Sequence, residues 1–282
     1  MVSIIERVPT GLPEFDKMIE GGFPRESVNL LSGGCGTGKS TFAMQFLYYG
    51  AKYRNEPGVY VTLEEEPEKL IKNMALFGWD IEKLVNDKKI MVIKPDVYKF
   101  ESIKQIMSDA IDKIGAKRLV VDSYSVLLTY FSDPYEIRNG LVQLDREIKK
   151  MGSTALIISD IKDKSEIFST TGVEEFIVDG VIVLHMLRDK KNPNEYLRAI
   201  SVRKMRATKH SLNYYPFGIT EKGVSVRGKG MSGNGKGYGT GGPSNFSAKR
   251  DKPAKKEEAD EPMVDIGMLK SKGTHSWKWK HL

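Results

Sequence analysis

One glycine-rich stretch constrains the fold of this chain more than any other. It reads Ser32-Gly33-Gly34-Cys35-Gly36-Thr37-Gly38-Lys39-Ser40-Thr41 and matches the pattern G-x-x-x-x-G-K-[ST] from Gly33 to Ser40. The segment Val28-Asn29-Leu30-Leu31 precedes it and is typical of a short buried strand, and residues 42–49 follow it with helical spacing of apolar groups. This order of strand, loop and helix is the context in which the pattern binds phosphate. The stretch therefore predicts a nucleoside triphosphate site.

The residue types in this loop suit that chemistry. Glycines let the backbone curl so that successive N–H groups point at phosphate oxygens, and the helix that follows offers the positive end of its dipole. Lys39 is predicted to reach the β- and γ-phosphates and to serve catalysis, and the Ser40 hydroxyl is predicted to ligate Mg²⁺. A glycine-rich turn that fits by chance is the alternative. The predicted nucleotide contacts from the loop are Gly34, Gly36, Thr37, Gly38, Lys39, Ser40 and Thr41.

Positive charge is concentrated in the C-terminal part of the chain. The net charge is +7, and the residues from Arg227 onward include twelve Lys and Arg against six Asp and Glu. Residues 1–226 are therefore nearly neutral, which gives no argument for a nucleic-acid surface there. The single cysteine, Cys35, excludes an intrachain disulfide. We expect a cytoplasmic protein without a transmembrane segment, because no apolar run reaches ~18 residues and no signal-peptide layout is present.

Apolar runs that alternate with helical patterns predict an α/β fold with a mostly parallel sheet covered on both faces. A short helix is expected around Met18 and Ile19. Strands are expected at 28–31, 58–63, 90–93, 118–123 and 154–159, and helices at 42–49, 67–77, 100–114 and 134–151. After Gly172 strands follow one another without helices, at 180–186, 196–204 and 224–226, which predicts an antiparallel C-terminal extension.

We predict one domain over 1–226, followed by a disordered tail of two segments. Residues 227–262 are rich in Gly and Lys and then charged, so they bury too little apolar surface to offset their ordering entropy, and a flexible linker is expected. Residues 263–282, with Trp277 and Trp279, are predicted to form a short docking peptide for an unknown protein or nucleic acid. A purely solubilising tail and contact with an anionic membrane surface stay open as alternatives.

Asp122 directly follows the apolar residues Leu119-Val120-Val121 of the strand expected at 118–123, which is the Walker-B arrangement. A carboxylate at this place holds Mg²⁺ directly or through water, opposite Ser40. An aspartate that caps the next turn is the alternative, and the phosphate loop upstream favours the metal role.

Glu64 and Glu65 follow the predicted strand 58–63, at the sheet edge where parallel α/β folds bind ligands. Adjacent residues of an extended chain point in opposite directions, so one carboxylate is able to orient the attacking water while the other supports it. An acidic first turn of the next helix, favoured by its dipole, explains the pair equally well. The spacing leaves both interpretations open.

Several motifs in combination resemble RecA-superfamily ATPases of the KaiC type. They are Gly21-Gly22-Phe23-Pro24, Thr62-Leu63-Glu64-Glu65, Phe77-Gly78-Trp79-Asp80, Gly172-Val173-Glu174-Glu175-Phe176, Lys204-Met205-Arg206-Ala207-Thr208-Lys209-His210 and Pro216-Phe217-Gly218-Ile219-Thr220. The resemblance runs from about residue 4 to residue 226 and implies a single KaiC-like domain with a RecA-like core. It also implies ATP and Mg²⁺ as ligands, slow ATP hydrolysis, and catalytic roles for Glu64 and Glu65.

The resemblance further implies sites that are completed between subunits. In the KaiC type the Lys-x-Arg strand reaches the nucleotide of the adjacent subunit, which implicates Lys204, Arg206, Thr208 and His210. A solvated strand edge is the simpler explanation of these charges. The implied assembly is a homo-oligomeric ring, expected to be a hexamer. Autokinase activity is not expected, because the phosphorylated Ser-Thr pair of two-domain family members aligns with Glu175 and Phe176.

Three function classes follow from these observations. The leading one is a ring-forming regulatory or signalling ATPase. The second is an accessory ATPase of DNA recombination or repair, since RadA-like proteins share the core, although the nearly neutral core argues against it. The third is a nucleotide-dependent module that binds a partner with little hydrolysis.

Overall fold

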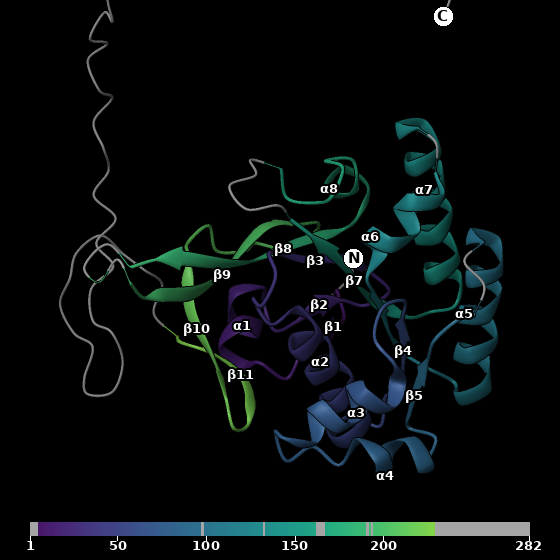
Figure 1. The fold of residues 1–282 in the computed structure, drawn as a ribbon, viewed down its shortest axis with the longest axis horizontal. Coiled ribbons are helices and arrows are strands. Elements are labelled where there is room, and N and C mark those ends of the chain that lie inside the picture. Colours follow the sequence, from purple (N-terminus) through teal and green to yellow (C-terminus); the bar gives the residue numbers. More distant parts are fainter. Residues whose placement is uncertain are drawn as a thin grey trace, which may run out of the picture. The chain divides into compact units, whose positions relative to one another are not determined.

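The structure is a computed structural model of the chain, and it describes residues 5–96, 99–131, 133–161, 167–189, 192 and 194–228. Within these residues a nine-stranded sheet has the order β11-β10-β9-β8-β3-β7-β6-β4-β5 (Figure 1). The expected α/β class with a mostly parallel sheet and antiparallel C-terminal strands is confirmed. The predicted linker beyond Gly228 and the predicted docking peptide lie outside the described residues.

The parallel part of the sheet places the ends of several strands together. Its strands are β3 (Val28–Gly33), β4 (Gly58–Thr62), β5 (Ile90–Ile93), β6 (Arg118–Asp122), β7 (Thr154–Asp160) and β8 (Gly180–Arg188). In the register of this sheet Gly33 lies opposite Asp160 and Leu184, and Thr62 lies opposite Asp122. The carboxyl ends of β3, β4, β6 and β7 therefore meet at one edge of the sheet.

Helices cover both faces of the sheet and enclose two apolar cores. One core takes side chains from α1 (Pro13–Met18), α2 (Lys39–Tyr53), α3 (Pro67–Ala75) and α4 (Ile81–Asn86). The other takes them from α5 (Phe100–Ile114), α6 (Tyr124–Leu127), α7 (Pro134–Lys150) and α8 (Glu174–Ile177), with a 3₁₀ turn at Leu128–Tyr130. Neighbouring residues of β3 alternate between these cores, as Leu30 and Leu31 do.

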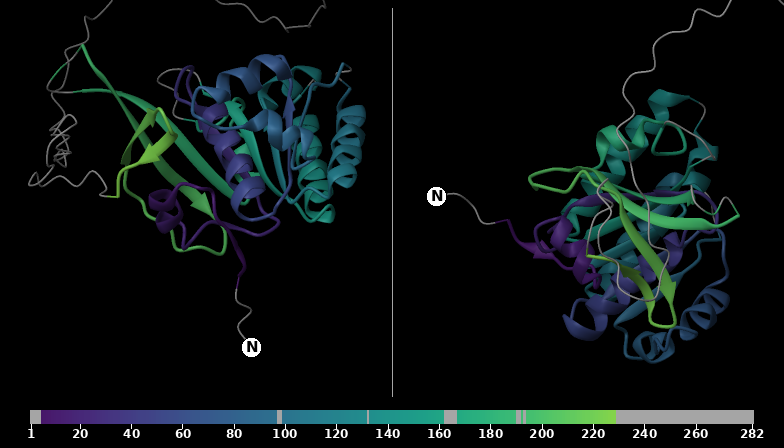
Figure 2. Two further views of the ribbon diagram at one scale, coloured as in Figure 1. Left: turned by 90° about the horizontal axis from the view of Figure 1, so that it is seen from below. Right: turned by 90° about the vertical axis from the view of Figure 1, so that its left-hand side faces the viewer.

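An antiparallel extension continues the sheet beyond β8. It comprises β9 (Tyr196–Met205), β10 (Tyr215–Thr220) and β11 (Gly223–Val226), which lie to one side of the helical layers in Figure 2. A separate ribbon pairs β1 (Arg7–Val8) with β2 (Phe23–Pro24). The sequence missed β10, because Pro216 and Gly218 interrupt its strand pattern.

One helical prediction needs correction and one helix was missed at the N-terminal side of the fold. The helix expected around Met18 and Ile19 begins at Pro13 and ends at Met18, because the fixed φ of proline suits the first helical turn. Helix α4 was not predicted, and it is too short for a clear periodic pattern. Asp80 caps it by accepting a hydrogen bond from the Lys83 amide at 3.1 Å.

Arg118 links three segments through a fully buried guanidinium. Its Nε and one Nη donate to the same Glu56 oxygen at 2.9 and 2.6 Å, and its other Nη donates to the carbonyls of Pro9 and Phe46 at 2.9 and 2.8 Å. Gly50 makes room for it, since a Cβ there would lie 2.2 Å from Nε. This cation thus joins β6, α2 and the chain before α1.

We expect Arg118→Met to lower the free energy of unfolding by about 3 kcal/mol, because Glu56 and two carbonyls lose a buried donor. Arg25→Met is the matched control. Arg25 meets the same carboxylate at 3.0 Å from a partly exposed position, so its loss should cost about 1 kcal/mol or less. Urea unfolding measures both values, and equal losses would contradict the assigned role of Arg118.

Candidate nucleotide-binding site

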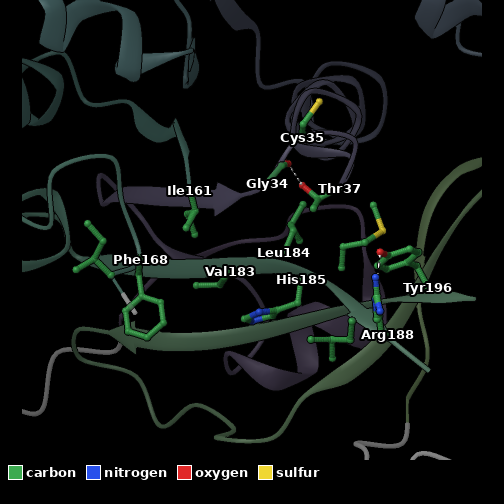
Figure 3. A pocket seen from close by; sticks show the side chains of 13 residues that line it. Gly34, Cys35, Thr37, Ile161, Phe168, Val183, Leu184, His185, Arg188 and Tyr196 are labelled. Atoms are coloured by element: carbon green, nitrogen blue, oxygen red, sulfur yellow. Dashed lines mark hydrogen bonds between the residues drawn. The ribbon is translucent and has the colours of Figure 1, made fainter. Parts of the chain in front are cut away.

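The phosphate loop, residues 33–41, joins the end of β3 to the start of α2. Gly36 and Gly38 have φ values of 71° and 103°, in the left-handed region that favours glycine. A Cβ at Gly33 would lie 2.6 Å from the Thr37 hydroxyl, and one at Gly38 would lie 2.8 Å from Ile219. Conformation therefore favours glycine at positions 36 and 38, and lack of space requires it at positions 33 and 38. Thr37 also closes the loop by donating to the Gly34 carbonyl at 2.9 Å (Figure 3).

Lys39 is the first residue of α2, and its ammonium lies back along the loop. It donates to the carbonyls of Gly33 and Gly34 at 2.9 and 3.0 Å and forms an ion pair with Asp160 at 3.0 Å. Asp160 ends β7, the strand beside β3. The sequence analysis missed Asp160, because a single carboxylate after an apolar strand is a weak signal.

Ser40 and Asp122 lie together, as a shared metal site requires. The Ser40 hydroxyl donates to Asp122 Oδ2 at 2.7 Å, and the Tyr60 hydroxyl donates to the same oxygen. Burial raises the pKa of Asp122, against the hydrogen bonds from Tyr60 and Ser40, and the nearby Glu64 charge raises it further. The peptide bond after Asp122 is cis.

A hydroxyl beside a carboxylate is an oxygen-only ligand set, which suits Mg²⁺. Within the described part of the chain no group of three or more His, Cys, Asp and Glu residues is arranged to hold a metal ion. Mg²⁺ commonly completes its shell with water and substrate phosphates instead of a protein cage. Ser40 and Asp122 thus fit a metal ion that arrives with a nucleotide.

The structure separates the two adjacent glutamates. The Glu64 carboxylate accepts a hydrogen bond from the Ser123 hydroxyl at 2.8 Å, directly beside Asp122. The Glu65 carboxylate instead accepts one from Asn73 of α3 at 3.1 Å and lies 3.4 Å from Lys69. Geometry therefore places Glu64, and not Glu65, beside the Ser40–Asp122 pair.

The predicted Lys-x-Arg contacts lie away from this chain's own phosphate loop. Lys204 and Met205 pair with the first residues of β8, at the sheet edge where the parallel strands begin. The Lys204 ammonium donates to the carbonyls of Glu175, Phe176 and Val178, and Arg206 contacts Asp179 and the Phe176 carbonyl. Lys204 and Arg206 therefore lie at the opposite end of the strands from the phosphate loop.

Of the remaining predicted nucleotide contacts, Thr41 lies at the phosphate loop, whereas Thr208 and His210 lie away from it. Thr41 lies in the first turn of α2, next to Ser40. The Thr208 hydroxyl accepts a hydrogen bond from Arg7 at 2.6 Å, and His210 Nδ1 lies 3.2 Å from the Ser211 carbonyl. Within one chain the structure therefore groups Lys39, Ser40, Asp122 and Glu64, but not Thr208 or His210, around the loop.

Two features beside the loop were not predicted from the sequence. Arg198 of β9 donates to the Gly36 carbonyl at 3.3 Å. A cavity of about 890 Å³ lies between the loop and β8, with Phe168, His185 and Tyr196 among its lining residues (Figure 3). Burial lowers the pKa of His185 to about 4, with the Arg203 charge adding to the effect. These residues lie far from the loop in sequence, so no local pattern could associate them with it.

Comparison with known families agrees with this geometry. The family model described as "ATPase: KaiC" matches residues 8–230, which include the phosphate loop, Asp122 and the antiparallel strands. The chain belongs to the KaiC family. The resemblance predicted from the motifs is therefore confirmed, and nucleotide binding follows as a family property.

Relatives within the KaiC family match this chain over different shares of their own length. UPF0273 protein MJ1359 of Methanocaldococcus jannaschii is 40% identical, and the match covers 79% of this chain and 96% of that protein. The circadian clock oscillator protein KaiC of Prochlorococcus marinus is 32% identical, but the match covers 46% of its length and 79% of this chain. This chain thus corresponds to a single KaiC-like domain.

A solved structure in the KaiC family supports the fold directly. The crystal structure of KaiC-like protein PH0186 from Pyrococcus horikoshii matches with a TM-score of 0.72 and 40% identity, covering 79% of this chain and 100% of that one. Among the described residues, no helix combines the length and apolar character needed to cross a bilayer.

We expect Asp122→Asn to weaken nucleotide binding in the presence of Mg²⁺ by about tenfold, because the anionic ligand is lost. Most of the affinity that Mg²⁺ adds in wild type should therefore disappear. Affinity for ADP in EDTA should change little, since an amide oxygen can still accept the Ser40 hydrogen bond. Calorimetric titration with and without Mg²⁺ measures this effect. Asp112→Asn, at an exposed position of α5, is the control, and an unchanged Mg²⁺ gain in Asp122→Asn would refute the metal role.

Proposed function

We propose that this chain hydrolyses Mg-ATP as a member of a homo-oligomeric ring, expected to be a hexamer, and that hydrolysis drives or times a regulatory change in the ring. Membership of the KaiC family supports the nucleotide. The observation that carries the hydrolysis proposal is the 2.8 Å hydrogen bond between Ser123 and Glu64, since it holds a carboxylate beside Asp122.

Each residue around the phosphate loop would have a separate role in ATP hydrolysis. Lys39 would hold the β- and γ-phosphates, while Ser40 and Asp122 would hold Mg²⁺, which supplies positive charge against the charge that develops on the phosphates. Glu64 would orient the attacking water and accept its proton. Positioning and electrostatic stabilisation would then account for most of the rate, as in other phosphoryl transfers.

The opposite sheet edge supports the idea of sites completed by a neighbour. Arg206 carries five N–H donors, and contacts with Asp179 and the Phe176 carbonyl engage two of its nitrogens, so donors remain for a phosphate oxygen. The three N–H donors of Lys204 are matched by three carbonyl contacts. Arg206 is therefore the stronger candidate for a contact with the nucleotide of an adjacent copy, with Lys204 in support.

The two other function classes depend on the tail after residue 226. DNA recombination or repair, and partner binding with little hydrolysis, both use residues that lie almost entirely outside the described part of the chain. The described residues add no observation in favour of either class.

We expect Glu64→Gln to reduce the rate of phosphate release from Mg-ATP by about 100-fold or more, because the group that orients water is neutralised. Glu65→Gln is the matched variant, and its rate should fall by less than about tenfold, since Glu65 contacts α3. ADP affinity, measured beside turnover, should stay near wild type in both. A larger loss in Glu65→Gln would contradict the assignment of Glu64.

We expect Arg206→Ala to assemble like wild type but to lose turnover by about 10³-fold, as loss of a trans arginine does in related chemistry. Light scattering and a phosphate-release assay measure assembly and rate. Lys39→Ala should also be inactive, but because the phosphate loop of the same chain is impaired. When the two variants are mixed into common rings, activity should partly return, since an intact loop then meets an intact Arg206. Mixed rings without any recovery would refute the trans role.

A further inference from the structure

The ion pair between Lys39 and Asp160 belongs to no role assigned above. Lys39 is nearly buried, with 11% of its side chain exposed, whereas the Asp160 side chain is 50% exposed. An ammonium group has three N–H donors, and the two loop carbonyls and Asp160 match all three. Lys39 therefore has to give up at least one of these partners before it donates to a phosphate oxygen.

The charge of each partner of Lys39 determines which one a phosphate would displace. The carbonyls of Gly33 and Gly34 are neutral parts of the loop, but the Asp160 carboxylate is an anion at 3.0 Å from the same nitrogen. A phosphate close to Lys39 repels this carboxylate, because like charges a few ångströms apart interact unfavourably near a protein surface. The released carboxylate is half exposed, so it returns to water without a burial penalty.

The main chain of Asp160 is held while its side chain is able to turn. Its amide donates to the Ser125 hydroxyl at 2.9 Å, and its carbonyl accepts a hydrogen bond from the Thr170 hydroxyl at 3.1 Å. The Ser125 and Thr170 oxygens also lie 2.8 Å apart. Asp160 is thus paired with Gly33 in the sheet and fixed on both sides, so a change of partner needs only side-chain rotation.

We propose that Asp160 competes with nucleotide phosphates for Lys39 and thereby limits the affinity of the site for nucleotides. Asp160 acts through Lys39 and contacts no reacting atom, so it is an affinity-determining residue and not a catalytic one. The proposal rests on nucleotide binding at the phosphate loop, as part of the proposed function. The proposal predicts that neutralising Asp160 strengthens nucleotide binding. If Asp160 instead supported the site, its neutralisation would weaken binding.

The experiment is a calorimetric titration of the full chain with ADP, in Mg²⁺ and in EDTA. Asp160→Asn should bind ADP about twofold to fivefold more tightly than wild type under both conditions, the range expected for a part-exposed ion pair. The gain should shrink at high ionic strength. Asp160→Glu, which keeps the charge, should stay close to wild type, and so should Glu68→Gln, which removes an exposed carboxylate from α3.

The contrary outcomes are distinct. If wild type binds ADP but Asp160→Asn binds it equally or more weakly in EDTA, the competition proposal is overturned while the proposed function stands. If Asp160→Asn weakens binding only with Mg²⁺ present, Asp160 is a metal ligand and the proposal is equally overturned. If wild type does not bind ADP at all, the proposed function and this proposal fail together.

Discussion

The register of the parallel strands around β3 is the constraint on which the site depends. It sets Gly33 opposite Asp160 and Thr62 opposite Asp122, so that the loop, the metal carboxylate and the glutamate segment meet at one edge. A slip by one residue would turn every side chain of a strand to the other face and separate these groups. The two apolar cores prevent such a slip, because neighbouring residues of β3 pack into different cores.

Polar groups at this edge already satisfy one another. Asp122 accepts from Ser40 and Tyr60, Glu64 accepts from Ser123, and Lys39 is held by the loop and Asp160. Tyr60 is buried, and Lys39, Ser40 and Asp122 are partly buried. Polar groups that lose water are costly unless they are paired, so the contacts among these residues stabilise the edge in the arrangement observed. Binding of an anion here is then an exchange of partners, and its affinity depends on which existing contacts are given up.

The edge where the parallel strands begin carries a different set of polar groups. Lys204 and Arg206 gather around the carbonyls at the end of α8 and around Asp179, so these cations stabilise their own chain as well as presenting charge at its surface. Burial lowers the pKa of Lys204, and the Arg206 charge adds to this effect. The two edges thus differ in composition: Lys39 lies among Asp122, Asp160 and Glu64 at the loop edge, whereas Lys204 and Arg206 surround Asp179 and neutral carbonyls at the other.

The sequence by itself determined the phosphate loop, the strand that ends at Asp122, the alternation of strands and helices, and the KaiC family. These features are local, since they depend on motif spacing or on a period that a short window contains. Only the tertiary structure decided that Glu64 and not Glu65 lies beside Asp122, that Asp160 holds Lys39, and that Lys204 lies at the far edge. These contacts join residues distant in the chain, and strand order and register bring them together, which no local pattern encodes.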